Sequence, residues 1–277
     1  MAIRFGTDGW RAIIGEDFTF ANVRVCAEAL ARDLSQTGAA AAGVVVGYDT
    51  RFGSDRFASA TAEVLAAHNV HVWLCERAAP TPAVSHAVVR LSAGGGVVIT
   101  ASHNPAAWNG FKVKTAMGSS SPPEHVARLE ERIAAVLKEG AEVSRLPLHA
   151  ARQAGTVETF DPTGPYLEQL GRLVDRERLR SANLLVVADA MHGAGGGLVP
   201  RLFAGSRVRV VELNGRANPA FPGMDQPEPV AANLRRLMST VPEVGAPVGL
   251  ALDGDADRLG VVDENGRYLT TLEVFSL

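Results

Sequence analysis

Two short stretches carry most of the side chains whose types and spacing could do chemistry. TASHNP (100–105) places a serine, a histidine and an asparagine directly after the apolar run 97–99. DGDADR (253–258) places three aspartates at alternate positions and ends on an arginine. A hydroxyl and a group of carboxylates suit phosphoryl transfer, in which the protein positions a nucleophile and neutralises charge.

Ser102 is the candidate nucleophile of the first stretch. Acyl transfer fits it poorly, because Thr100 and Asn104 occupy the glycine positions of a G-x-S-x-G elbow. His103 is its direct neighbour, and neighbouring side chains of an extended chain point to opposite sides. A hydroxyl at the carboxyl end of a strand, where α/β folds bind ligands, fits phosphoryl chemistry better. An ordinary turn is the alternative, since serine, asparagine and proline are common turn residues.

Asp253, Asp255 and Asp257 form the candidate metal site. On a straight strand, successive members of this set would stand about 6.6 Å apart, too far to share one ion. Gly254 and Ala256 allow the backbone to curl and bring the carboxylates together. Two carboxylates 4 Å apart repel by about 4 kcal/mol at an effective dielectric constant of 20, so the cluster favours a cation. An all-oxygen set suits Mg²⁺, and a solvated acidic loop is the alternative.

Other motifs compete for the same residues. An EF-hand loop starting at Asp253 would find Glu264 at its twelfth position, but Arg258 replaces the glycine required at the sixth. A phosphatase of the haloacid-dehalogenase kind would use Asp253 as its nucleophile and leave Ser102 without a purpose. The glycine-rich HGAGGG (192–197) could hold a phosphate at a helix N-terminus or could serve close packing.

Alternating apolar runs and helical patterns indicate the elements that position these residues. Apolar runs at 43–49, 70–76, 95–101 and 248–252 are separated by segments with helical periodicity. This alternation is typical of parallel βαβ units with helices on both faces of a sheet. We therefore expect an α/β protein with two three-layer α/β/α domains whose sheets are mixed and mostly parallel. The polar stretch 146–155 places the first domain at 1–150 and the second at 156–270.

Composition limits the classes of protein and partner. The chain has 277 residues, 47% of them hydrophobic and 21% charged, with a net charge of −3. It has no apolar run near the roughly 18 residues of a membrane helix and no secretory signal at its start. We expect a cytoplasmic protein that binds neither nucleic acid nor membrane, with Cys26 and Cys75 as buried free thiols. Only Lys112, Lys114 and Lys138 among the 27 basic residues are lysines, and lysine, unlike arginine, can lose its proton.

Taken together, these stretches resemble the α-D-phosphohexomutases, the family of phosphoglucomutase and phosphomannomutase. The resemblance rests on FGTDGWRA (5–12), GYDTR (47–51), TASHNP (100–105), NGFKVK (109–114), PEPV with its following helix (227–239) and DGDADR (253–258). FGTDGWRA is closer to the glucose and mannose branches than to the glucosamine branch, which typically reads FGTDGIRG. The resemblance covers the first half of the family's pattern, and 271–277 corresponds only to the beginning of a third domain.

The resemblance implies a mutase that interconverts hexose 1-phosphate and hexose 6-phosphate, with glucose or mannose as the sugar. Ser102 would carry the phosphoryl group and bind Mg²⁺ together with Asp253, Asp255 and Asp257. A bisphosphorylated sugar would be the intermediate, and hexose 1,6-bisphosphate the activator.

The resemblance also implies roles for the remaining site residues. Lys112 is the candidate proton carrier for the sugar hydroxyl, and His103 a hydrogen-bond partner of the phosphoserine. Arg258 can stabilise developing charge, and Arg11 would border the substrate. Because the family's last two domains have no counterpart here, we expect weak or no turnover by the chain alone. The alternative is a non-catalytic protein that binds Mg²⁺ or phosphosugar, or a half-enzyme completed by a partner chain.

Overall fold

The computed structural model describes residues 3–277, which divide into two compact units. The first comprises the chain up to Asp49 together with Gly53–Ala101 and Ala107–Pro162. The second comprises Thr163–Leu277 and, by their contacts, the short segments Thr50–Phe52 and Ser102–Ala106. The loop that carries the candidate serine therefore belongs to the second unit, although the chain around it belongs to the first.

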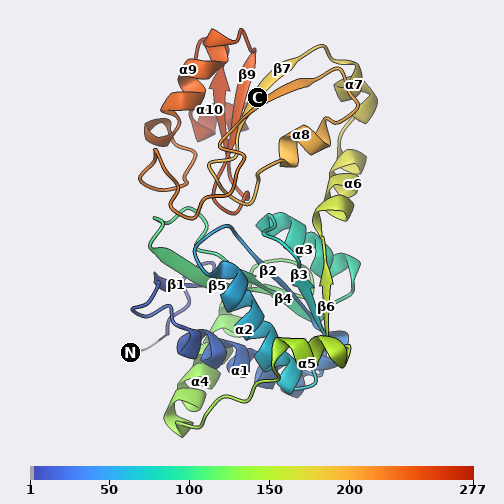
Figure 1. Ribbon diagram of the computed structural model, residues 1–277, viewed down its shortest axis with the longest axis vertical. Coiled ribbons are helices and arrows are strands. Elements are labelled where there is room, and N and C mark those ends of the chain that lie inside the picture. The colour runs from blue at the N-terminus through green and yellow to red at the C-terminus, as the bar shows by residue number, and fades with distance from the viewer. Residues whose placement is uncertain (1–2) are drawn as a thin grey trace. The chain divides into compact units, whose positions relative to one another are not determined.

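A six-stranded mixed sheet forms the centre of the first unit, in the order β1-β5-β4-β2-β3-β6 (Figure 1). Its strands are β1 (Trp10–Ile13), β2 (Val44–Tyr48), β3 (Val72–Cys75), β4 (Gly95–Ile99), β5 (Trp108–Thr115) and β6 (Val157–Phe160). Strands β4, β2, β3 and β6 are parallel, whereas β5 and β1 run antiparallel to their neighbours. The expected mixed, mostly parallel sheet is confirmed.

The unit boundary differs from the expected one near residues 150–156. Strand β6 pairs in parallel with β3, with Val157 opposite Val72, so the first unit continues to Pro162. The reason is tertiary: β6 is a short strand whose pattern, VETF, gives no indication of the sheet that it joins.

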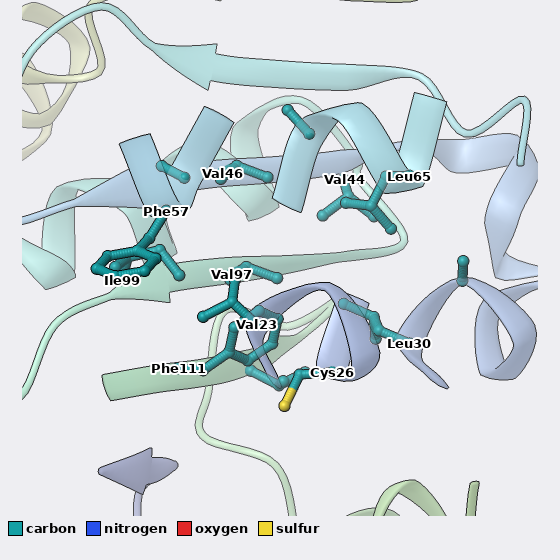
Figure 2. Close-up of a cluster of buried hydrophobic side chains, with 14 of the residues drawn as sticks. Val23, Cys26, Leu30, Val44, Val46, Phe57, Leu65, Val97, Ile99 and Phe111 are labelled. Atoms are coloured by element: carbon teal, nitrogen blue, oxygen red, sulfur yellow. The ribbon is translucent and has the colours of Figure 1, made fainter. Parts of the chain in front are cut away.

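Helices cover both faces of the first sheet. They are α1 (Phe20–Thr37), α2 (Ser54–Ala67), α3 (Thr81–Arg90), α4 (Pro123–Glu139) and α5 (Leu148–Gln153), with the 3₁₀ turn η1 (Ala39–Ala42). Because side chains alternate along a strand, Val44 and Val46 pack with α1 and α2 in one core (Figure 2), while Val45 packs with α3 in another. This is the expected three-layer α/β/α arrangement.

The second unit contains a five-stranded mixed sheet in the order β11-β10-β9-β7-β8. Its strands are β7 (Leu185–Asp189), β8 (Arg209–Leu213), β9 (Val248–Leu252), β10 (Leu259–Asp263) and β11 (Tyr268–Leu269). Its helical elements are α6 (Thr163–Leu173), α7 (Arg176–Ser181), α8 (Leu198–Leu202), η2 (Ala231–Asn233), α9 (Arg235–Glu243) and α10 (Thr271–Phe275). Leu237 and Val241 of α9 pack with Val187, Ala251 and Val262 of the sheet.

The loops whose side chains could do chemistry all follow strands. Residues 102–106 follow β4, residues 50–52 follow its parallel neighbour β2, and DGDADR follows β9. Ligands of open α/β sheets bind at the carboxyl ends of the strands, so these are the expected places for a site. Cys26 and Cys75 are buried and free, as predicted. None of the helices within residues 3–277 combines the length and the apolar character needed to cross a bilayer.

Candidate active site

The DGDADR loop curls tightly between β9 and β10. Ala256 adopts a left-handed backbone conformation with φ of 57°, and its N–H donates to the Asp253 carbonyl oxygen at 3.0 Å. Asp253 Oδ1 accepts hydrogen bonds from the N–H groups of Asp257 at 2.9 Å and Arg258 at 3.0 Å. The curl brings one carboxylate oxygen from each of the three aspartates to within 4.8 Å of one another. The expected clustering of the three carboxylates is present.

The electrostatics of this cluster favour a cation. Asp253 and Asp255 have no exposed surface, whereas Asp257 is exposed. Burial raises the pKa of Asp253 to about 8, and the neighbouring charges of Asp255 and Asp257 act in the same direction. At neutral pH such a group holds either a proton or a metal ion. Within residues 3–277 this group consists of three carboxylates and no histidine or cysteine, a donor set that fits Mg²⁺.

Ser102 lies directly against the aspartate loop. It is 2% exposed, its φ is 52°, and its Oγ donates a hydrogen bond to Asp253 Oδ2 at 2.9 Å. The ring nitrogen Nδ1 of His103 lies 3.4 Å from the same hydroxyl oxygen. A Cβ atom on Gly254 would come within 2.4 Å of the Ser102 carbonyl oxygen. Glycine at this position is therefore what permits the serine loop and the aspartate loop to meet.

Arg258 is paired with a residue that the sequence reasoning missed. Its Nη1 donates to Glu228 Oε1 at 3.1 Å, and the other oxygen of Glu228 accepts from Gln226 Nε2 at 2.6 Å. Glu228 belongs to PEPV, so its only signal in the sequence was its place in that motif. The ion pair holds an exposed arginine beside the aspartate loop.

Lys112 and Arg11 belong to the first unit. Lys112 is 1% exposed, and its Nζ lies 2.8 Å from Asp8 Oδ2. Lys114 Nζ lies 3.6 Å from Asp8 Oδ1. Burial alone would raise the pKa of Asp8, but the two lysines and the Ser120 hydroxyl outweigh it and lower that pKa. Asp8 of FGTDGWRA is thus a second missed residue: it holds a carboxylate against the candidate proton carrier.

Arg11 lies on β1, where it is paired with Gly110 of β5. A Cβ atom on Gly110 would come within 3.1 Å of the Arg11 Cγ and 2.4 Å of the Thr100 carbonyl oxygen. The glycine of NGFKVK therefore accommodates a close approach of neighbouring strands.

The glycine-rich segment 192–197 packs against the aspartate loop. A Cβ atom on Gly193 would come within 2.6 Å of the Gly254 carbonyl oxygen, and the Ala194 N–H donates to that oxygen at 2.9 Å. These contacts favour close packing over phosphate binding as the reason for the glycines. The EF-hand interpretation fails, because DGDADR is flanked by two strands instead of two helices.

Comparison with known proteins agrees with the resemblance seen in the sequence motifs. The chain matches two family models: phosphoglucomutase/phosphomannomutase α/β/α domain I over residues 2–139 and domain II over residues 164–266. A probable phosphoglucosamine mutase of Methanothermobacter thermautotrophicus is 36% identical over 99% of the chain. A phosphoglucomutase/phosphomannomutase of Thermococcus kodakarensis is 34% identical over 99% of the chain. The chain covers 57% and 58% of these two relatives.

Solved structures agree with the sequence comparison. A crystal structure described as a "putative phosphomannomutase" from Thermus thermophilus superimposes with a TM-score of 0.87 and 36% identity. The match covers 98% of this chain and 59% of that protein. The chain thus spans a little more than half the length of the proteins that it matches.

Proposed function

Because the chain belongs to the α-D-phosphohexomutase family, we propose that it supplies the phosphoserine and metal-binding part of a hexose phosphate mutase. The observation that carries this proposal is the 2.9 Å hydrogen bond from the Ser102 hydroxyl to Asp253 within the group of three carboxylates. A hydroxyl buried beside a cation-binding cluster is suited to carrying a phosphoryl group, because the charge of that group can be neutralised there.

The proposed reaction consists of two phosphoryl transfers. A free hydroxyl of a hexose monophosphate attacks the phosphorus carried on Ser102, loses its proton, and the bond between phosphorus and Ser102 Oγ breaks. The product is a hexose 1,6-bisphosphate. Ser102 Oγ then attacks the other phosphorus of this bisphosphate, and the bond between that phosphorus and its sugar oxygen breaks. The sugar oxygen takes up the proton lost in the first transfer, which regenerates the phosphoserine and releases the isomeric monophosphate. The net change is movement of phosphate between positions 1 and 6 of the sugar.

Each site residue has a proposed part in these transfers. Asp253, Asp255 and Asp257 would hold Mg²⁺, which when bound neutralises phosphate charge and polarises the transferring group. Arg258 adds a guanidinium beside these carboxylates. His103 offers a ring nitrogen near the Ser102 oxygen.

Two residues of the first unit have proposed parts in handling the substrate. Lys112, as the neutral amine, receives the proton of the attacking sugar hydroxyl, as its resemblance to the family lysine implies. Asp8, whose carboxylate lies 2.8 Å from Lys112 Nζ, would stabilise the ammonium that this transfer forms. Arg11 borders the sugar phosphate.

The sugar itself is a separate part of the proposal. The sequence suggests glucose or mannose phosphate, whereas the names of the relatives include glucosamine, glucose and mannose. The experiment should therefore compare the 1-phosphates of all three sugars, each primed with a hexose 1,6-bisphosphate. Conversion to the 6-phosphate would identify the preferred substrate.

Intact-mass measurement tests the central step. After incubation with glucose 1,6-bisphosphate and Mg²⁺, we expect one added phosphoryl group on the chain and none on Ser102→Ala. Ser119→Ala, at an exposed serine, is the matched control and should be phosphorylated like the unmodified chain. Phosphorylation that survives in Ser102→Ala would contradict the proposal, and release of inorganic phosphate that depends on Asp253 alone would favour a phosphatase.

The alternative is a protein that binds Mg²⁺ or phosphosugar without turnover, or one half of a two-chain enzyme. The chain covers 57% of the length of the Methanothermobacter thermautotrophicus relative. Phosphorylation of Ser102 without conversion of any hexose phosphate would support this alternative. Conversion that appears only after adding the remaining portion of a relative as a separate chain would identify the half-enzyme.

A further inference from the structure

Arg51 makes an unusual set of contacts with the loop that carries Ser102. This arginine is 3% exposed, and its Nη2 donates to the carbonyl oxygens of Ser102 and Asn104, both at 2.7 Å. Its Nη1 donates to the carbonyl oxygen of Pro105 at 2.9 Å. The guanidinium carbon lies 5.2 Å from the centre of the Phe221 ring. One side chain therefore contacts three of the loop's five carbonyl groups and rests on an aromatic face.

The fold brings Arg51 to this loop through the pairing of two strands. Strands β2 and β4 are parallel neighbours, so the segments that follow them leave the same edge of the sheet. The Asp49 N–H donates to the Ile99 carbonyl oxygen at 3.0 Å, and Thr100 Oγ1 donates to Asp49 Oδ2 at 2.6 Å. These bonds fix both segments where they leave the sheet, just before the loop begins. Arg51, two residues beyond Asp49, then reaches the loop 102–106.

The backbone of Ser102 explains why such contacts matter. With φ of 52°, Ser102 occupies the left-handed region, which residues with a Cβ atom rarely adopt. The direction of a carbonyl group follows from the backbone angles around it. A planar guanidinium with donors in fixed positions can be satisfied by one arrangement of three carbonyls and not by others. Arg51 thereby selects the loop conformation in which Ser102 Oγ is 2.9 Å from Asp253.

We infer that Arg51 is a positioning residue for the phosphoryl carrier. It acts through Ser102, whose carbonyl oxygen accepts a hydrogen bond from Arg51 Nη2. This inference rests on the proposed role of Ser102 and adds a residue that sets the geometry of the transfer. A purely structural arginine would stabilise the fold without changing the rate constant of phosphorylation in the folded protein.

The test compares Arg51→Lys with the unmodified chain. The lysine keeps the charge but cannot contact three carbonyls in one plane. Starting from dephosphorylated protein, phosphorylation of Ser102 is followed by intact mass over a range of glucose 1,6-bisphosphate concentrations with saturating Mg²⁺. Because a displacement of about 1 Å costs on the order of 100-fold in rate, we expect the rate constant to fall about 100-fold. The half-saturating bisphosphate concentration and the Mg²⁺ affinity, measured by calorimetry, should change less than about threefold, because no binding group is removed.

Thr50→Val is the matched control for this experiment. Thr50 lies beside Arg51, and its hydroxyl donates to the His192 carbonyl oxygen at 2.9 Å instead of to the serine loop. The rate constant of Ser102 phosphorylation in Thr50→Val should stay within about threefold of that of the unmodified chain, because the geometry of Ser102 is retained. An unchanged rate constant in folded Arg51→Lys, or equal losses in both variants, would overturn the inference.

Two further measurements keep the inference testable if the first experiment fails. If Arg51→Lys does not fold, Phe221→Leu removes the ring beneath the guanidinium, and a loss of about 3- to 10-fold in the rate constant is expected from the lost cation–π contact. An unchanged rate would then overturn the inference. If Ser102 of the unmodified chain is never phosphorylated, the proposed function fails. Hydrogen exchange at the amides of His103, Asn104 and Ala106 then tests whether Arg51 holds the loop. Faster exchange there in Arg51→Lys, with exchange at 253–258 unchanged, supports a role in holding the loop; equal exchange contradicts it.

Discussion

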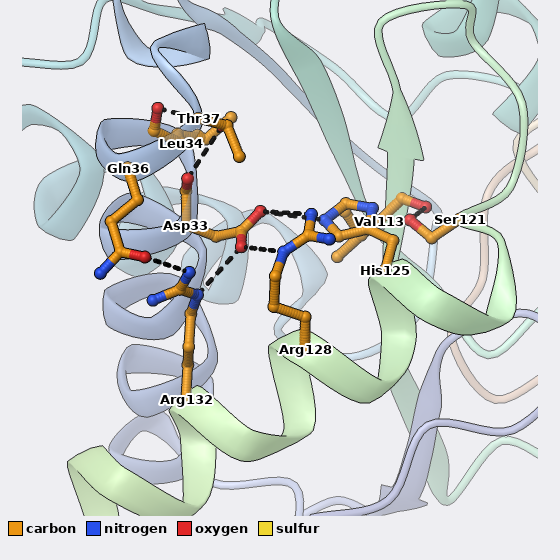
Figure 3. Close-up of polar contacts among 9 residues, drawn as sticks. All are labelled: Asp33, Leu34, Gln36, Thr37, Val113, Ser121, His125, Arg128 and Arg132. Carbon is orange, nitrogen blue, oxygen red and sulfur yellow. Dashed lines mark hydrogen bonds and ion pairs between the residues drawn. The ribbon is translucent and has the colours of Figure 1, made fainter.

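Two buried carboxylates of this protein have opposite electrostatic surroundings. Asp33 of α1 is 2% exposed and Asp253 is 0% exposed, so water reaches neither side chain, although Asp33 lies nearer to the surface. Asp33 accepts from Arg128 Nε at 2.7 Å and Arg132 Nε at 2.9 Å, both on α4 (Figure 3). His125 Nε2 lies 3.3 Å from its other oxygen. Asp253 instead shares its surroundings with Asp255 and Asp257.

The pKa values of the two groups follow their neighbours. Burial would raise the pKa of Asp33, but the hydrogen bonds from Arg128 and Arg132 outweigh it and lower the pKa. Burial and two carboxylates raise the pKa of Asp253 to about 8. Low exposure alone therefore does not distinguish a structural acid from a site acid. The cations around Asp33 come from the protein, whereas the cluster at Asp253 favours a cation from outside.

The largest effect is expected from a substitution at the site itself. We expect Asp253→Asn to weaken Mg²⁺ binding by at least about 100-fold, since even partners of metal ligands contribute about 10- to 100-fold. In the absence of Mg²⁺ the variant should be no less stable than the unmodified chain, because a neutral amide replaces a buried acid whose ionised form is repelled by its neighbours. Calorimetric titration and thermal unfolding measure the two quantities. Unchanged Mg²⁺ affinity would show that the aspartates do not form the metal site.

The matching change at Asp33 should have the opposite outcome. Asp33→Asn leaves the guanidinium groups of Arg128 and Arg132 without their charged partner, and we expect the free energy of unfolding to fall by about 2 kcal/mol. This value is below that for a fully buried pair, because Arg128 is partly exposed. Urea unfolding measures the loss. Mg²⁺ affinity should be unchanged, and a change would contradict the assignment of Asp33 to the fold alone.

The stability that Mg²⁺ adds should depend on pH. The folded pKa of Asp253 lies near 8, above its ordinary value, so the folded state binds a proton more tightly than the unfolded state. Stability of the Mg²⁺-free protein should therefore fall as pH rises between about 4 and about 8. Mg²⁺ at one fixed concentration, ten times its dissociation constant at pH 8.5, should restore about 1.4 kcal/mol at that pH. Thermal unfolding measures this gain, which should shrink at pH 5, where a proton competes with the ion.

The smallest effect is expected from Asp33 in acid. Its folded pKa is lowered, so its contribution to stability is present above the unfolded pKa of about 4 and is lost as pH falls through the folded pKa. Between pH 6 and pH 3 the stability difference between the unmodified chain and Asp33→Asn should narrow by about 1 kcal/mol. Urea unfolding at each pH measures the gap. A gap that widens in acid would show that the ion pairs do not control this carboxylate.

Much of the fold and part of the site could be predicted from the sequence. The alternation of apolar runs and helical patterns predicts two mixed α/β sheets, because burial on both faces imposes that pattern on the strands. Ser102 and the three aspartates could be singled out because their types and spacing limit the chemistry that they can do. The strand order and the place of β6 could not, because both depend on pairing between distant segments.

The residues that sequence reasoning missed share one property: each acquires its role only through groups that are distant in the sequence. Arg51 acts on carbonyl oxygens of a loop 51 to 54 positions later, and carbonyl groups are present at every residue. Asp8 and Glu228 acquire their roles only through Lys112 and Arg258, which are distant in sequence. These residues lie in stretches that resemble the family, namely GYDTR, FGTDGWRA and PEPV. Only three-dimensional contacts give a role to each side chain.

The assignment of residues 102–106 to the second unit has a consequence for the inheritance of this architecture. A single cut in the gene near the codon for Pro162 would separate the two sheets cleanly but would part this loop and Arg51 from Phe221 and the aspartate loop, which they contact. Recombination that exchanged one half for that of a distant homologue would need a compatible glycine at 254 and a compatible ring at 221. The two halves are therefore expected to have diverged as a co-adapted pair.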